Sequence, residues 1–293
     1  MLDTRTTIVA GFVVALLLAG TAISFARSIR TSPRLALPLR LWGYSLLALA
    51  TGLAGVAARD HIPAFLSIVA GNTLVVAAVV LSYRSLRAFQ GPAPADPLGW
   101  ALVAAVFVSL WVLLDVWPDL GARIAVLSAV RAFLLARNAW QLGRTVPPEC
   151  RVSFAFTRAV FWFAAVAMIG RGLFGAWQPP TGDFMAPNPV NAIPYLAFAC
   201  VSVAATLGVL WIVVQFLQGE LVRLASRDGL TGLLNRPAFL AEFDKELSRS
   251  ERAGEVFSLA VFDLDRFKAL NDLYGHPAGD EALRRVAAAM RGV

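Results

Sequence analysis

The sequence is poor in the residue types that build disulfide-rich, metal-binding and ordinary soluble proteins. It contains two cysteines and two histidines among 293 residues, and only 15% of its residues are charged. Cys150 lies in an arginine-flanked segment and Cys200 lies inside an apolar run, so neither a disulfide framework nor a metal-ligand spacing is present. An ordinary soluble domain carries about a quarter charged residues. Water is therefore not the expected solvent for most of this chain.

Long apolar runs are abundant instead, with 58% hydrophobic residues and a mean hydropathy of +0.67. A helix needs about 20 mostly apolar residues to cross the hydrocarbon of a bilayer. Seven windows approach this length, and they cover residues 8–26, 37–58, 62–83, 98–117, 123–142, 156–177 and 193–217. The first window lacks a clean cleavage site, so we expect a retained anchor and not a signal peptide. The fifth window is the weakest, because Arg131 and Arg137 lie within it and a charge at mid-bilayer costs about 2.5–3.5 kcal/mol. Six spans remain an alternative to seven.

Charges between the windows predict the orientation, because Lys and Arg accumulate in cytoplasmic loops. The segments after the odd-numbered windows are basic, with Arg27, Arg30, Arg34, Arg84, Arg87, Arg144, Arg151, Arg223 and Arg227. The other connections are nearly balanced or acidic, with Arg59, Asp60, Asp119, Arg123 and Asp183. Seven spans then place the N-terminus outside and the C-terminal part in the cytoplasm. The net charge of +7 is explained by this topology, and nucleic acid is not the expected partner.

Three ionisable residues lie near or within the predicted spans, namely Asp115, Arg131 and Arg171. Such residues are candidates for function by default, and pairing between helices or snorkelling to the interface is the alternative. No repeated polar face or broken-helix pair indicates a transport path.

The chain after the last window predicts a connecting helix. Apolar residues recur at alternating three- and four-residue steps, at Leu210, Val214, Leu217, Leu221 and Leu224. This stripe is typical of a helix that pairs with its copy and passes a signal on, or it is simply the end of the last span. Composition becomes charge-rich near Gln218. We predict a membrane domain over 1–217, a signalling-helix linker over 218–227 and a second domain over 228–293.

The second domain shows both helical and strand patterns. Asn235 is the expected cap of a helix that Pro237 opens and Gly254 ends. Residues 256–262 predict a buried strand, and two further helices follow, the second of which opens after Gly275. This order predicts part of an α/β sandwich.

Two acidic residues, Asp263 and Asp265, would follow that strand, where open sheets bind ligands and hard cations such as Mg²⁺ find carboxylates. A solvated turn is the alternative at this position. An EF-hand is excluded, because Phe267 and Lys268 occupy positions that need an oxygen ligand and a glycine.

The most specific pattern combines two motifs, Asp228-x-Leu-Thr-x-Leu-x-Asn235-Arg236 and Asp263-x-Asp-x-Phe-Lys268-x-x-Asn271-Asp272-x-x-Gly-His276-x-x-Gly-Asp280. In order and spacing it resembles the opening half of a GGDEF (diguanylate cyclase) domain, which has a nucleotidyl-cyclase-like α+β sandwich fold, over residues 226–293. Members of that family condense two GTP molecules into cyclic di-GMP, and each domain of a dimer presents one GTP. The resemblance implies GTP as substrate, Mg²⁺ or Mn²⁺ as cofactor, a homodimer formed through the 210–224 helix and the GGDEF domain, and the bacterial inner membrane as location.

The resemblance also implies roles for single residues. Asp263 and the backbone carbonyl of Leu264 would bind the metal, Phe267 and Lys268 would border the phosphates, and Asn271 and Asp280 would read the guanine edge. These types suit guanine, because a carboxylate accepts from its N1 and N2 donors and an amide both donates and accepts. Structural or loop-ordering roles are expected for Asp228, Asn235, Arg236, Asp265, Asp272 and His276. For Asp228 and Arg236, an interaction between this loop and the domain body competes with a helix cap and a solvated arginine.

The 293 residues do not contain the Gly-Gly-(Asp/Glu)-Glu-Phe loop that names the family. We therefore expect this chain alone to lack cyclase activity, although its parent would be an intact cyclase under control of the membrane domain. Two alternatives stay open. One is a degenerate domain that binds GTP without turning it over, and the other is a membrane receptor with a regulatory tail.

Overall fold

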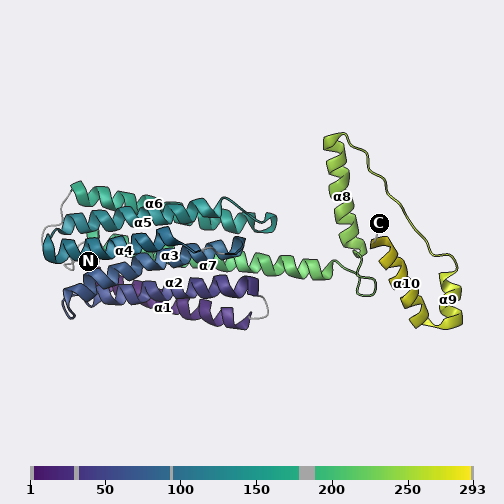
Figure 1. Cartoon of the computed structure of the whole chain (residues 1–293), viewed down its shortest axis with the longest axis horizontal. Helices are drawn as coiled ribbons and strands as arrows, with labels where there is room; N and C mark the ends of the chain where they lie inside the picture. Colours follow the sequence, from purple (N-terminus) through teal and green to yellow (C-terminus); the bar gives the residue numbers. More distant parts are fainter. Residues whose placement is uncertain (1–2, 30–32, 93–94, 178–188, 292–293) are drawn as a thin grey trace. The chain divides into compact units, whose positions relative to one another are not determined.

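The computed structural model describes residues 3–29, 33–92, 95–177 and 189–291 (Figure 1). Arg30 and Asp183, whose charges contribute to the predicted orientation, lie outside the described residues. The side chains of Arg223 and Leu224 lie outside them as well. The chain divides into two compact units, Met1–Gln215 and Phe216–Val293. The predicted divisions after 217 and 227 stay predictions. We describe each unit by itself.

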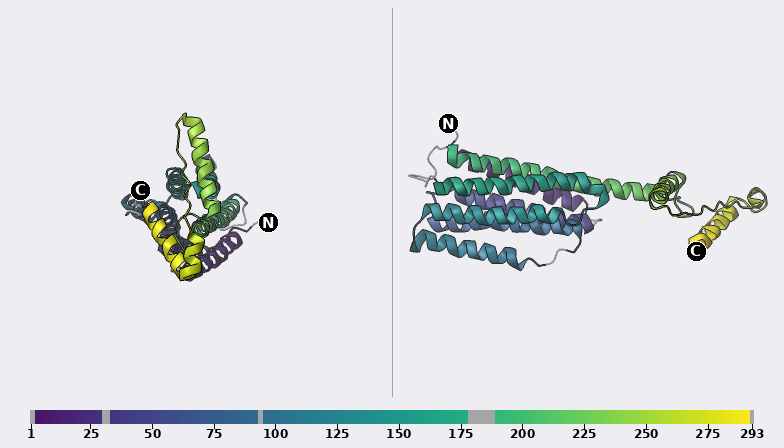
Figure 2. Two further views of the ribbon diagram at one scale, coloured as in Figure 1. Left: turned by 90° about the vertical axis from the view of Figure 1, so that its right-hand side faces the viewer. Right: turned by 90° about the horizontal axis from the view of Figure 1, so that it is seen from above.

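The first unit is a bundle of long helices that lie side by side (Figures 1 and 2). The helices are α1 (Thr4–Ser28), α2 (Pro33–Ala57), α3 (Gly71–Gln90), α4 (Pro97–Trp111), α5 (Leu120–Leu142), α6 (Arg151–Trp177) and α7 (Pro189–Ala225), the last of which continues into the second unit. Short π-helical segments, η1 (Phe65–Ala70) and η2 (Val112–Val116), adjoin α3 and α4, and a 3-10 turn, η3 (Pro148–Cys150), precedes α6. Helices suit this apolar sequence because they satisfy every interior backbone group without water.

Carboxylates begin several of these helices. The side chains of Asp3, Asp96 and Asp119 accept the backbone N–H groups of Thr6, Gly99 and Ala122, respectively. Each bond satisfies one of the N–H groups that a helix start leaves without a partner. The acidic residues between the apolar runs therefore fix where the helices start.

Glycines allow close crossings inside the bundle. A β-carbon on Gly52 of α2 would lie 2.7 Å from the carbonyl oxygen of Gly71 at the start of α3. On α7, a β-carbon on Gly208 would meet the Thr157 hydroxyl of α6. Small residues at such crossings let helix backbones pack directly, which is the usual way that helices associate in lipid.

Six helices of the described residues are long and apolar enough to cross a membrane. They cover Thr4–Ser28, Arg34–Ala57, Phe65–Gln90, Pro97–Val116, Pro148–Gly175 and Ala192–Leu221. Six of the seven predicted windows are thus confirmed as helices of this kind. The remaining window coincides with α5, which has 23 residues but carries Arg123, Arg131 and Arg137. A seventh crossing by α5 stays a prediction.

The second unit contains α8 (Arg236–Ala253), α9 (Phe267–Tyr274) and α10 (His276–Arg291). The Asn235 side chain accepts the N–H of Ala238 at the start of α8, at 3.1 Å. Gly254 ends that helix in the left-handed conformation, with φ +67°. The predicted cap, stop and helices are confirmed.

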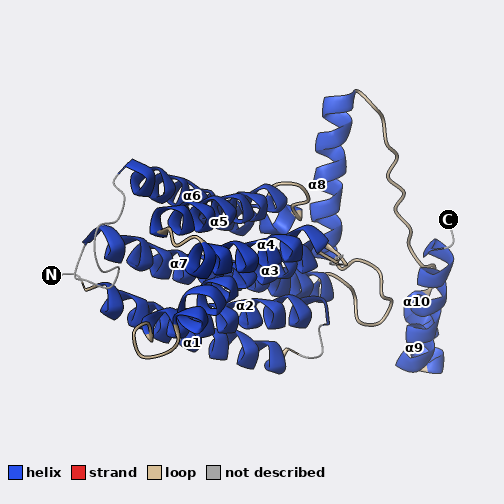
Figure 3. Ribbon diagram, turned by 60° about the vertical axis from the view of Figure 1, so that its left-hand side comes forward, coloured by secondary structure: helices blue, strands red, loops and turns tan. Residues whose placement is uncertain are grey.

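The strand predicted over 256–262 is not formed, and this prediction was wrong for the described structure (Figure 3). Val256 is fully exposed and Phe262 is 72% exposed, so the segment is not buried either. A strand needs a neighbour to pair its backbone N–H and C=O groups. The described residues of this unit provide none, since their only bridge joins Arg227 to Leu234. The structure therefore does not confirm an α/β sandwich.

Candidate functional site

The first motif of the second unit forms a closed loop around Asp228. Its carboxylate accepts the Thr231 hydroxyl at 2.7 Å and the backbone N–H groups of Thr231 and Leu230 at 2.8 and 3.2 Å. These bonds favour the charged form, and the Thr231 hydroxyl contributes most, so the pKa of the Asp228 carboxyl lies below its usual value of 3.8. Asp228 thus organises its own loop.

Backbone hydrogen bonds complete this closure. Asp228 N–H donates to the Leu233 carbonyl, and Asn235 N–H donates to the Ser226 carbonyl, both at 2.8 Å. Gly232 lies between them with φ +67°, a conformation that glycine adopts at little cost. The loop therefore has a defined shape that leads directly into α8.

The loop contacts the rest of its unit through a residue that sequence reasoning did not single out. The guanidinium of Arg291, near the end of α10, donates to the Thr231 carbonyl. Arg236 is the exposed first residue of α8. Asn235, and not Asp228, is the helix cap here. The predicted contact of Arg236 with the domain body stays a prediction. Arg291 has no local signal in the sequence, because its partner lies 60 residues away.

The predicted metal and phosphate residues follow one another at the start of α9. Asp263 and Asp265 are exposed on the extended segment that precedes this helix. The Leu264 carbonyl accepts the N–H of Phe267 at 3.3 Å, which leaves one of its lone pairs open. Phe267 is half-buried at the first position of α9 and Lys268 is exposed beside it. The expected strand edge is absent, so these residues are held by the turn into α9 alone.

The two residues expected to read guanine are brought close together. The Asn271 side chain on α9 lies against Gly279 on α10, so closely that a β-carbon at position 279 would overlap it. Asp280 is the next residue of α10 and is half-buried. Gly275, with φ +79°, makes the turn between the helices and donates its N–H to the Asn271 carbonyl at 2.8 Å. Within this helical hairpin, the predicted guanine-reading residues Asn271 and Asp280 therefore lie close together, on either side of the turn at Gly275.

Two further predicted residues, Asp272 and His276, lie on either side of the turn at Gly275. Asp272 is exposed on α9, and His276 is the exposed first residue of α10. Their loop-ordering roles stay predictions.

The donor chemistry of the segment fits a hard divalent cation, but the described residues supply only part of a site. No group of three or more His, Cys, Asp or Glu side chains among them could hold a metal. Asp263 and the Leu264 carbonyl are both oxygen donors, which Mg²⁺ prefers, and Mg²⁺ commonly takes one or two carboxylates together with waters and substrate phosphates.

The first unit holds a different set of polar groups, which includes the ionisable residues that the sequence singled out. Arg131 of α5 is buried, and its guanidinium donates to the Asn72 side chain at 3.1 Å. Arg171 of α6 lies 5.7 Å from the centre of the Tyr195 ring. Asp115 is exposed near the end of α4. Arg131 is therefore an interior group, Arg171 is half-buried, and Asp115 is exposed.

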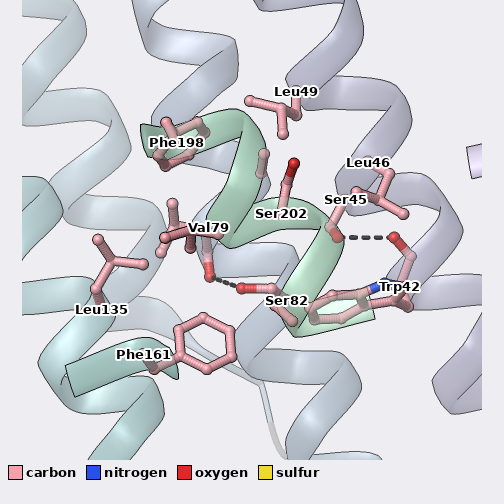
Figure 4. Close-up of a pocket in the computed structure, with 13 residues that line it drawn as sticks. Trp42, Ser45, Leu46, Leu49, Val79, Ser82, Leu135, Phe161, Phe198 and Ser202 are labelled. Atoms are coloured by element: carbon pink, nitrogen blue, oxygen red, sulfur yellow. Dashed lines mark hydrogen bonds between the residues drawn. The ribbon is translucent and has the colours of Figure 1, made fainter. Parts of the chain in front are cut away.

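The bundle also contains a partly open apolar pocket of about 50 Å³ (Figure 4). Leu46, Leu49 and Phe161 form much of its wall, and serine hydroxyls lie at its edge. The hydroxyls of Ser45 and Ser82 donate to carbonyls of their own helices, at 2.7 and 2.8 Å. This pocket offers shape and apolar surface but little polar chemistry.

Comparison with known proteins places the second unit in a family context. Residues 225–293 match the family model "Diguanylate cyclase, GGDEF domain". The resemblance drawn from the two motifs is thereby confirmed for this part of the chain. None of the solved structures matches the chain.

The relatives that match are signalling proteins. Diguanylate cyclase DgcP of Pseudomonas aeruginosa is 45% identical over 67 residues, which are 23% of this chain and 10% of that protein. Diguanylate cyclase DosC of Escherichia coli K12 is 44% identical over 62 residues, 21% of this chain and 14% of that protein. An uncharacterized signaling protein of Caulobacter vibrioides is 43% identical over 72 residues, 23% of this chain and 9% of that protein. The chain thus spans between 9% and 14% of the length of each of these relatives.

Proposed function

We propose that this chain, whose residues 225–293 match the GGDEF family model, is the membrane-anchored sensory part and the opening of the catalytic domain of a diguanylate cyclase. One observation carries the proposal. The matched residues directly continue α7, which belongs to a bundle containing six helices fit to cross a membrane. A cyclase domain joined to such a bundle by one continuous helix is suited to receive a signal from the membrane.

In this proposal the membrane unit crosses the bilayer seven times, with α5 as the seventh crossing helix. At one end, Arg123 of α5 lines the same cavity as Arg59, which follows α2. At the other end, Gln141 of α5 bonds to Gln90 at the end of α3, at 2.5 Å. Helix α5 therefore extends along the whole bundle, as its neighbours do. Its crossing agrees with the loop charges, which predict an outside N-terminus and a cytoplasmic second unit.

The proposed reaction joins two GTP molecules. The 3′-hydroxyl of one GTP attacks the α-phosphorus of the other, the bond to the β-phosphate oxygen breaks, and pyrophosphate leaves. Two such reactions close the ring of cyclic di-GMP. In this scheme Asn271 and Asp280 orient the base, and Lys268 places a positive charge beside the phosphates. The protein contributes mainly by positioning and by neutralising charge, as is usual in phosphoryl transfer.

Asp263 and the Leu264 carbonyl would hold the divalent cation. When bound, such an ion neutralises charge on the phosphates and lowers the pKa of the attacking hydroxyl. Further oxygen ligands would come from the signature loop, which these 293 residues do not contain.

Dimerisation belongs to the proposal, because each domain presents one GTP and two must face each other. The continuous helix α7 supplies the 210–224 segment predicted to pair. Leu221 is 66% exposed and Val214 is 44% exposed, which leaves part of the apolar stripe open to a second copy.

A turnover assay tests the proposed function. The reading frame continued through the signature loop should convert radiolabelled GTP into cyclic di-GMP in proteoliposomes, whereas residues 1–293 alone should not. GTP binding without turnover by the continued protein would favour the degenerate sensor, and the absence of both would favour a receptor with a regulatory tail.

A further inference from the structure

The interior of the membrane unit contains arginines whose positive charges are not paired with a carboxylate among the described residues. Arg131 and Arg171 line one small cavity together with Asn72 and Tyr195. The two arginines reach this cavity from neighbouring helices, Arg131 from α5 and Arg171 from α6. None of the ion pairs formed by the described residues joins a carboxylate to either arginine. Two guanidinium groups therefore face one cavity without a counter-charge in the described part of the unit.

A second cavity shares several lining residues with this one and also includes residues near the start of α5. Asn72, Arg171 and Tyr195 also line a cavity of about 40 Å³, whose other walls include Arg59 and Arg123. Arg123 lies three residues after the start of α5, and Arg131 lies about 12 Å further along the helix, at a rise of about 1.5 Å per residue. Arginines thus line both cavities, Arg59 and Arg123 the one nearer the bundle end and Arg131 the deeper one. The loop charges predict that this end faces away from the cytoplasm.

Several buried polar atoms at these cavities lack a partner. The Nε–H of Arg131 is buried and donates to no described neighbour, although the other end of the guanidinium donates to Asn72. The hydroxyl of Ser67, which lines the outer cavity, is also buried without a partner. Buried polar groups in native proteins are almost always hydrogen-bonded, and a buried charge needs a partner to offset its desolvation. A guest with acceptor atoms and negative charge would satisfy these groups.

The backbone at this place is also unusual. Ser67 and Ile68 belong to the π-helical segment η1, which precedes Asn72, and the Asn72 side chain donates to the Ile68 carbonyl at 2.9 Å. Such wide turns occur frequently at functional sites. Here the turn places the Ser67 hydroxyl and the Asn72 amide on the same cavity.

The lining of the outer cavity also includes the apolar residues Ile68, Leu110 and Leu127. A water needs about 10–15 Å³ of such space, so about 40 Å³ holds roughly three waters or one anion of a few heavy atoms. A lining that combines guanidinium groups with apolar side chains fits a guest with one anionic head and a short hydrocarbon tail. Guanidinium groups match the planar carboxylate with two parallel hydrogen bonds.

We propose that the membrane unit binds a small monocarboxylate anion where these two cavities adjoin. The charged contacts are Arg171, which lines both cavities, and Arg131, which lines the inner one. Asn72, Ser67 and Tyr195 are polar neighbours, and Ile68, Leu110 and Leu127 surround the hydrocarbon tail in the outer cavity. Arg59 and Arg123 draw the anion to the bundle end. Binding to the membrane unit is independent of any cyclase activity in the second unit.

Titration of ¹³C-acetate into the full chain, in nanodiscs of phosphatidylcholine, tests this site by NMR line broadening. Saturable binding is expected, and Arg131→Gln or Arg171→Gln should weaken it at least tenfold. Arg87→Gln is the matched control, because Arg87 is a half-buried arginine at the other end of the bundle, bonded to Gln141. This control should leave the affinity unchanged.

Three results would overturn the proposal. They are no saturable acetate binding, equal weakening by Arg87→Gln, and equal displacement of acetate by chloride or inorganic phosphate. The last result would show an unselective anion site or a phosphate site. If Arg131→Gln does not fold, Arg131→Lys and Arg171→Gln decide, because Lys keeps the charge but cannot form two parallel bonds to a carboxylate.

Discussion

Arg137 and Asp96 form a two-pronged ion pair between α5 and the start of α4, with Nη1–Oδ2 and Nη2–Oδ1 distances of 3.0 and 2.7 Å. The Asp96 side chain is 2% exposed and that of Arg137 is 21% exposed. Asp96 also accepts the N–H of Gly99 at the start of α4, and the Arg137 guanidinium lies 3.9 Å from the centre of the Tyr83 ring. One carboxylate therefore both starts α4 and neutralises a charge that α5 carries.

Breaking this pair should destabilise the membrane unit strongly. Asp96→Ala leaves the Arg137 charge buried without its partner, and such losses cost about 3–5 kcal/mol. Thermal denaturation of the purified chain in detergent should show a clearly lowered midpoint. Adding Arg137→Met should recover much of the loss, because an apolar pair of similar volume is often as stable as a buried ion pair.

The exposed pair of Arg5 and Asp60 is the control for that comparison. Asp60 has φ +73°, which asparagine tolerates, so Asp60→Asn removes the charge without straining the backbone. A loss of about 0–1 kcal/mol is expected. If Asp96→Ala and Asp60→Asn lower the stability equally, burial of the ion pair does not determine how much the pair stabilises the unit.

The ion pair also shows what the sequence could and could not predict. Local signals gave correct results, because the Asn235 cap and the Gly254 stop act within a few residues of themselves. Arg131 and Arg137 made the window over 123–142 look weak, since their partners Asn72 and Asp96 lie 59 and 41 residues away. Pairings over such distances leave no local pattern.

Dependence on distant partners also explains why the strand prediction was wrong and why one contact of the candidate site was missed. Residues 256–262 have the composition of a strand, but a strand depends on a distant neighbour that the described residues do not provide. The motif spacing predicted which residues gather near α9 and α10, and the contact of Asn271 with Gly279 is in keeping with that grouping. The contact between Arg291 and Thr231 could not be predicted.

The seven-span arrangement predicts opposite sides for the two ends of α5. With both native cysteines replaced, a cysteine at Pro118 should react with a membrane-impermeant thiol reagent added outside cells. A cysteine at Thr145 should react only after the cells are opened. Reaction of both from the same side would show that α5 does not cross.

The Asp228 loop should open in acid. Because its folded pKa is lowered below 3.8, the carboxylate supports the closed loop fully above that pH, and this support is lost as the pH falls through the lowered value. NMR of ¹³C-aspartate in the purified chain should give a titration midpoint below 3.8. Thr231→Val removes the main hydrogen bond and should move the midpoint upward, and an unchanged midpoint would show that the hydroxyl does not matter.

Gly279→Ala should weaken guanine recognition in the continued protein. The new methyl group would push the Asn271 side chain from its place, and the loss of one hydrogen bond of about 0.5–1.5 kcal/mol lowers kcat/KM for GTP roughly 2- to 13-fold. Gly229→Ala is the matched control, since a β-carbon there meets nothing within 4 Å. If the two variants lose activity equally, Asn271 does not depend on Gly279 for its position.

Asp263→Ala should nearly abolish turnover in the continued protein while leaving membrane insertion intact. Stabilisation of developing charge by a bound cation is worth several kcal/mol, so cyclic di-GMP formation should fall by about 100-fold or more. Asp265→Asn, two residues along the same exposed segment, retains hydrogen bonding and should keep most of the activity. The two rates are compared across a Mg²⁺ titration, where Asp263→Ala should need much more Mg²⁺ for any residual turnover. If Asp263→Ala keeps the wild-type rate at ordinary Mg²⁺, Asp263 is not a metal ligand. If Asp265→Asn loses more activity than Asp263→Ala, Asp265 is the metal ligand instead.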